Sequence, residues 1–80
     1  MITEWFFEKA KEVVAQELDV EKDDVVIVWA AKILRNRKAI LFSPECLGIL
    51  FEVTYDGAEN KFYVDKYKKE RNFSMEVKYE

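Results

Sequence analysis

The chain has 80 residues, half of them apolar, and includes six Phe, four Tyr and two Trp. This composition predicts one folded domain over residues 1–80 and excludes a disordered chain; two Gly and one Pro leave no room for a linker. Thirteen basic and sixteen acidic side chains give a net charge of −3, which argues against a protein that coats DNA through a basic excess.

Residues 3–18 have the clearest helical pattern in the chain and are predicted to form a helix. Thr3 is a suitable N-cap, and apolar side chains recur at helical spacing on one face, namely Phe6, Ala10, Val13, Val14 and Leu18. The opening stretch MITEWFFEKAKE has no basic leader, and its apolar run is too short to span a bilayer. We therefore expect neither secretion nor insertion into a membrane.

After Asp19 the apolar period changes from 3.6 to 2, which indicates strands. The predicted strands are residues 25–34, 38–43, 48–55, 61–68 and 72–79, although the alanines in VVIVWAAKIL leave a helical alternative open for the first. SPECLG at 43–48 is a connection. The predicted fold class is α+β, with one N-terminal helix packed on an antiparallel sheet of four or five strands.

Side-chain alternation predicts which sheet face packs against the helix. In residues 72–79 the core set is Phe73, Met75, Val77 and Tyr79, and in residues 48–55 it is Ile49, Phe51 and Val53. A hairpin loop of two or four residues at Asp56-Gly57 sets Phe62 and Val64 on that face, whereas an odd loop sets Tyr63, Asp65 and Tyr67 there. The even loop buries the better set, and we expect it.

The second sheet face is more apolar than a solvated face usually is. If Ile27, Trp29 and Ile33 point to the helix, then Ala30 and Leu34 join the second face. The predicted interaction surface on it comprises Val26, Val28, Lys32, Leu41, Leu50, Glu52, Thr54, Tyr63, Asp65 and Tyr67. Contiguous apolar patches of this kind usually mark contact surfaces, and a second copy of the chain is the most economical occupant.

Catalytic chemistry is sparse in this sequence. Histidine is absent, which removes the commonest general base and zinc ligand, and Cys46 is alone, so no disulfide forms within the chain. A lone thiol fits a reducing cytoplasm. Glu52 and Asp65 could form a carboxylate pair, but with Lys32 on the same face an ordinary ion-pair cluster is the simpler interpretation. We predict a protein that is not an enzyme and uses neither a metal nor a cofactor.

Basic residues support one alternative function. The RNRK stretch contributes Arg35, Arg37 and Lys38, and Lys66 lies in a second basic cluster. With Tyr63 and Tyr67 they could form a surface that stacks bases and binds phosphates of a single strand. The acidic balance counts against this alternative, so nucleic acid is the second hypothesis.

Three stretches, VVIVWAAKILRNRKAIL, FEVTYDG and FYVDKYKK, resemble an uncharacterised family of short proteins encoded by phages and prophages of Gram-positive bacteria. The matching residues are Trp29, Lys32, Leu34, Asn36, Lys38 and Ala39, then Glu52, Val53, Thr54, Tyr55 and Gly57, then Tyr63, Asp65, Tyr67, Lys68 and Lys69. Asp56 stands where the family pattern has Asn, and the resemblance covers about residues 5–70.

The resemblance implies a phage-derived accessory protein in the cytoplasm of a bacterial host, and it brings no assigned activity. Together with the missing catalytic groups, it leads us to expect a non-enzymatic module that binds a host or phage protein. Inhibition of a host defence system is one role that such a module could have.

Overall fold

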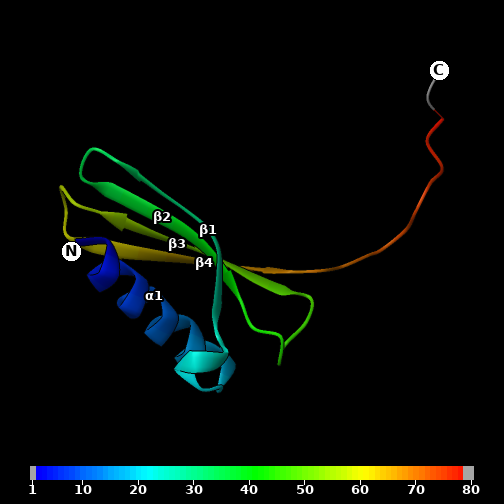
Figure 1. The fold of residues 1–80 in the computed structure, drawn as a ribbon, viewed down its shortest axis with the longest axis horizontal. Helices are drawn as coiled ribbons and strands as arrows, with labels where there is room; N and C mark the ends of the chain where they lie inside the picture. The colour runs from blue at the N-terminus through cyan, green and yellow to red at the C-terminus, as the bar shows by residue number, and fades with distance from the viewer. Residues whose placement is uncertain (1, 79–80) are drawn as a thin grey trace.

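The computed structural model describes residues 2–78, with side chains from residue 4 onward. Its elements are α1 (Ile2–Leu18), a 3-10 turn η1 (Lys22–Asp24), β1 (Val26–Ile33), β2 (Asn36–Phe42), β3 (Ile49–Asp56) and β4 (Lys61–Lys68). The strands form one antiparallel sheet in the order β1-β2-β3-β4, and α1 crosses one face of it (Figure 1). The α+β prediction is confirmed, with four strands. The side chains of Thr3 and Tyr79 lie outside the described residues.

The core lies between α1 and the middle strands. Phe6, Ala10 and Val14 of α1 are buried, as are Leu41 of β2 and Phe51 of β3. The burial of Phe6, Ala10 and Val14 confirms the helix face predicted from the 3.6-residue period. Removing their apolar area from water stabilises the packing of α1 on the sheet.

Aromatic side chains close the end of the core near the start of α1. Trp5 meets Tyr55 edge to face at a ring-centroid distance of 5.1 Å, and Phe6 stacks on Phe62 at 5.9 Å. Such pairs stabilise beyond their buried area, so they fix the start of α1 over β3 and β4.

The loop between β3 and β4 has four residues, 57–60, as the even-loop prediction requires. Val64 therefore pairs with Val53, and Phe62 pairs with Tyr55, on the side of the helix. The Oδ1 atom of Asp56 accepts backbone N–H bonds from residues 58 and 59, which stabilises the turn at its first residue.

The two hairpin tips lie against each other through Gly57. Its backbone N–H donates to Oδ1 of Asn36 at 3.1 Å. A Cβ atom at Gly57 would lie 2.3 Å from the carbonyl oxygen of Arg35, so only glycine fits there. This contact joins the β1–β2 turn to the β3–β4 loop.

A β-bulge in β1 overturns part of the predicted face assignment. Ile27 pairs with Leu41 but Trp29 pairs with Ile40, so Val28 is an extra residue in β1. Because side chains alternate along a strand, one inserted residue reverses the faces of all those that follow. The predicted faces from residue 29 onward in β1 were therefore wrong: Trp29 and Ile33 lie on the face away from α1, and Ala30 and Lys32 lie on the side of α1.

The predicted fifth strand, residues 72–79, is also wrong for the single chain. Residues 69–78 have no regular structure and run away from the sheet beyond the end of β4 (Figure 1). The side chains of Phe73, Met75 and Val77 are 69%, 77% and 62% exposed, so they are not part of the core. The backbone N–H of Lys69 donates to the carbonyl of Gly48 at 2.7 Å, which continues the course of β4 and does not start a turn.

Candidate functional site

The sheet face opposite α1, which we call the open face, is the candidate site. Register and alternation assign it these side chains: Val26, Trp29, Ala31, Ile33, Lys38, Ile40, Phe42, Leu50, Glu52, Thr54, Tyr63, Asp65 and Tyr67. Trp29, Ile33 and Tyr67 are 49%, 70% and 51% exposed, so no segment of the described chain covers them. The solvated face of an antiparallel sheet normally carries polar side chains, whereas many side chains of the open face are apolar or aromatic.

A small polar cluster lies at the centre of the open face. Glu52 and Asp65 are directly opposite each other on β3 and β4, which confirms the predicted neighbourhood of the two carboxylates. Lys38 Nζ lies 3.4 Å from Glu52 Oε2, and the Tyr67 hydroxyl donates to Glu52 Oε1 at 3.4 Å. The nearby Glu52 charge raises the pKa of the Tyr67 phenol. The cation of the cluster is Lys38 and not Lys32, because the bulge moves Lys32 to the other face.

Two features extend the open face toward its edges. Tyr63 donates its hydroxyl to Glu59 Oε1 at 3.2 Å, and this hydrogen bond to a carboxylate raises the pKa of the phenol. Toward β1, Trp29 and Ile33 line a hollow of about 410 Å³ together with residues of β2 and β3. The face therefore offers an apolar hollow beside a charged centre.

Most of the predicted interaction surface lies on the open face, but three residues do not. Val28 is the bulge residue, and it is exposed. Lys32 lies opposite Arg37 on the side of α1. Leu41 is fully buried under α1, because its place in β2 puts it opposite Phe51 of the core; its assignment to the surface was wrong.

Six residues of the open face are absent from the predicted interaction surface: Trp29, Ala31, Ile33, Lys38, Ile40 and Phe42. Of these, Lys38 was predicted only as a nucleic-acid contact. Residues 39–42 of β2 are apolar throughout, so no alternation indicates which side chains point outward. The pairing of β2 with β3 supplies the signal for Ile40 and Phe42. Leu41 lies opposite the buried Phe51, so its two neighbours in β2 must point to the open face.

The structure does not bring the four candidate nucleic-acid contacts together. Arg35 lies at a hairpin tip, and Lys66 pairs with Glu17 on the side of α1 at 3.3 Å. Arg37 is only 6% exposed and donates from its NH1 group to the carbonyl of Arg35 at 3.0 Å, while its Nε has no partner. Lys38 remains on the open face, paired with Glu52.

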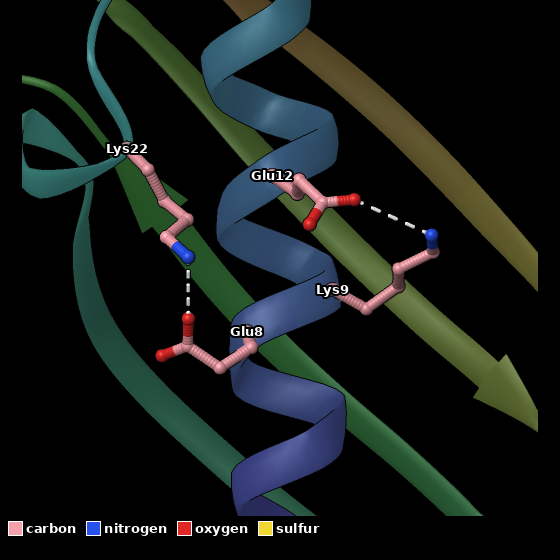
Figure 2. A network of polar contacts seen from close by, with 4 residues as sticks. All are labelled: Glu8, Lys9, Glu12 and Lys22. Carbon is pink, nitrogen blue, oxygen red and sulfur yellow. Dashed lines mark hydrogen bonds and ion pairs between the residues drawn. The ribbon is translucent and has the colours of Figure 1, made fainter.

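The outer side of α1 is polar and forms local ion pairs. Lys22 of η1 reaches back to Glu8 at 2.7 Å, and Lys9 meets Glu12 at 3.3 Å, as Figure 2 shows. The hydrogen bond with Lys22 lowers the pKa of the Glu8 carboxyl, and the same bond raises the pKa of the Lys22 ammonium group. The Lys22–Glu8 pair joins η1 to α1, whereas the Lys9–Glu12 pair lies within α1. Both pairs are exposed, as on an ordinary solvated surface.

The remaining chemistry is limited. Within residues 2–78, no three His, Cys, Asp or Glu side chains gather as a metal site would require. Cys46 is half-buried, and the sequence has no histidine to activate it. Among the described elements no helix combines the length and the apolar character needed to cross a membrane. That the protein is not an enzyme stays a prediction.

Comparison with known proteins gives a family and no activity. Residues 1–77 match the model of a family described as "Family of unknown function (DUF6275)". The match spans nearly the whole chain, so this protein belongs to that family. No curated protein and no solved structure matches the chain.

Proposed function

We propose that this member of the DUF6275 family is a small accessory protein that acts by binding another protein through its open face. The observation that carries the proposal is the exposure of Trp29, Ile33 and Tyr67 around the Glu52–Asp65 pair. Aromatic side chains are enriched at the centres of protein interfaces, where their burial contributes most of the binding energy.

Charge supports a partner of particular chemistry. Glu52 has Lys38 as a counterion, whereas Asp65, its cross-strand neighbour, is exposed and has the like charge of Glu52 beside it. Like charges directly opposite on a sheet destabilise it, and a basic side chain from outside would offset that cost. The fitting partner is a protein that presents an apolar patch with a Lys or Arg at its centre.

The setting that we propose is the cytoplasm of a Gram-positive bacterium infected by a phage or carrying a prophage. The support for it is the resemblance of residues 5–70 to short phage and prophage proteins, together with the single Cys of the chain. A host protein, such as a component of a defence system, is the partner that an accessory protein of this size would block by occupying a surface.

A charge-matched pair of variants tests the interaction. Asp65→Lys reverses the charge at the centre of the open face, and Glu21→Lys makes the same change at an exposed site, where the side chain makes no cap hydrogen bond. Proteins captured from host lysate by the wild type are the candidate partners; we expect Glu21→Lys to capture the same proteins and Asp65→Lys to lose them. Each is then purified and titrated.

We expect Asp65→Lys to weaken the affinity of such a partner at least tenfold, and Trp29→Ala to weaken it similarly. Equal binding by all four proteins would refute the open face as the site. Titration with single-stranded oligonucleotides at two salt concentrations addresses the alternative. Micromolar affinity that falls steeply with salt would favour nucleic-acid binding over the proposal.

A further inference from the structure

Residues 73–78 have the pattern of a strand but no strand beside them. Phe73, Met75 and Val77 alternate with Ser74, Glu76 and Lys78, and all six side chains are exposed. A segment with one apolar face is stable in water only when that face packs against something. The segment therefore lacks its packing partner in the single chain.

The outer edge of β4 is the matching surface. β4 pairs with β3 over eight consecutive residues without a register shift, so its other edge presents a regular row of unpaired backbone groups. The opposite edge of the sheet is β1, where the bulge at Val28 interrupts the ladder. On the helix side of β4, Val64 is still 40% exposed although its neighbour Val53 is fully buried.

Side-chain matching favours one antiparallel register between residues 72–77 and β4. A shift of two residues keeps the faces, but it sets Val77 opposite Asn60, beyond β4, or Met75 opposite Lys66. Val77 opposite Phe62 and Met75 opposite Val64 set apolar beside apolar on the helix side, and Glu76 then lies opposite Tyr63. Shifting the pairing by one residue sets Glu76 opposite Val64 and Met75 opposite Asp65. Cross-strand pairs determine the stability of a sheet, so the first register is favoured.

The chain between the two segments disfavours folding back onto its own β4. In that register a hairpin would turn either at Lys69-Glu70 or through a four-residue loop at 68–71. Two-residue hairpin turns need a positive φ, which Gly, Asn and Asp supply. A four-residue loop would have to begin at Lys68, which is still paired in β4 with Ile49. In the structure the Lys69 N–H bonds to Gly48 and continues the line of β4, and the following residues lead away from the sheet (Figure 1). A second copy can accept the segment without that turn, as in domain swapping.

We infer that residues 72–78 of one copy form a fifth strand along β4 of a second copy, and that the exchange is reciprocal. The sequence pattern that predicts a fifth strand is then satisfied between chains. This interface lies at the sheet edge and on the helix side, so it is separate from the open face and goes beyond the proposed function.

Adjacent lysine substitutions test which side of the segment packs. Sedimentation over micromolar to hundreds of micromolar concentrations should show a dimer for the wild type and for Ser74→Lys, and a monomer for Met75→Lys. Met75 is exposed in the single chain, so Met75→Lys should keep the circular dichroism spectrum of the fold. A monomeric wild type at hundreds of micromolar overturns the inference. So does a Met75→Lys dimer of wild-type affinity, or an equal loss of the dimer in both variants.

Cysteine cross-linking tests the exchange directly. In a Cys46→Ser background, the single variants Val64→Cys and Met75→Cys are mixed, refolded together and oxidised; opposed strand residues are close enough for a disulfide. A covalent heterodimer is expected from this mixture, and almost none when Ser74→Cys replaces Met75→Cys. If the mixture gives none, while the doubly substituted chain closes an internal disulfide, the segment folds onto its own β4 and the inference is wrong.

Discussion

Truncation of Phe51 gives the sharpest test of the core. Phe51 is fully buried, opposite Leu41 on β2, and lies in the cluster beneath α1. A buried aromatic side chain removes about 150–250 Å² from water. At about 25 cal/mol per Å², and with an alanine left in place, Phe51→Ala should lower the free energy of unfolding by about 3–5 kcal/mol.

Urea unfolding followed by circular dichroism measures this loss. A chain of this length has a total stability of about 4–12 kcal/mol, so Phe51→Leu is the milder companion, with an expected loss of about 1–2 kcal/mol. Leu50→Ala is the matched control, because Leu50 is the neighbouring residue on the open face and is partly exposed. All variants are compared at one low protein concentration.

For Leu50→Ala we expect a loss below about 1 kcal/mol. A loss that small for Phe51→Ala, or a larger loss for Leu50→Ala, would mean that the faces of β3 are assigned the wrong way round. The proposed interaction surface would then be core, and the open-face proposal would fail with it.

Three further outcomes follow from local geometry. Gly57→Ala should lose about 1–3 kcal/mol in urea unfolding, since its Cβ would meet the Arg35 carbonyl at 2.3 Å; an unchanged midpoint would contradict the contact between the hairpin tips. Leu34→Asn should gain about 0.5–1 kcal/mol, because Leu34 has φ 56° and is 88% exposed; a loss would show that Leu34 makes contacts. The carboxyl pKa of Glu8, followed by NMR, should lie below 4.5 and return toward it in Lys22→Gln. Because the folded-state pKa is lowered, this ion pair stabilises the fold above about pH 4.5 and is lost as the pH falls through the folded-state pKa.

The helix, the strands β1 to β4 and the face of the β3–β4 hairpin could be predicted from the sequence because their signals are local. A 3.6-residue apolar period determines which side of α1 is buried. Asp56-Gly57 indicates the turn, and an even loop alone sets both Phe62 and Val64 on the side of the helix. Predicting these elements requires no information about residues that are distant in the sequence.

The bulge and the missing fifth strand could not be predicted because their causes lie elsewhere in the fold. The stretch VVIVWAAKIL is apolar almost throughout, so a bulge at Val28 does not disturb any alternation of apolar and polar residues in the sequence. The bulge is apparent only from the pairing of β1 with β2. Residues 72–78 have a sound strand pattern, but pairing depends on the turn before them, at Lys69-Glu70. Alternation predicts faces within a strand and does not say whether a partner strand is within reach.

The two proposed interfaces, the edge of β4 and the open face, are separate surfaces with different roles. Strand exchange would use the edge of β4 and the helix side of the sheet, whereas the Glu52–Asp65 centre and the hollow beside Trp29 lie on the open face. Dimerisation at the edge therefore leaves both open faces free, and it presents two copies of the binding surface in one assembly. A partner that is itself multivalent would then be bound more tightly than either face binds alone, without any new contact, because the second binding event is intramolecular. On this reasoning Met75→Lys should leave the affinity of a single open face unchanged and reduce only the avidity for a multivalent partner.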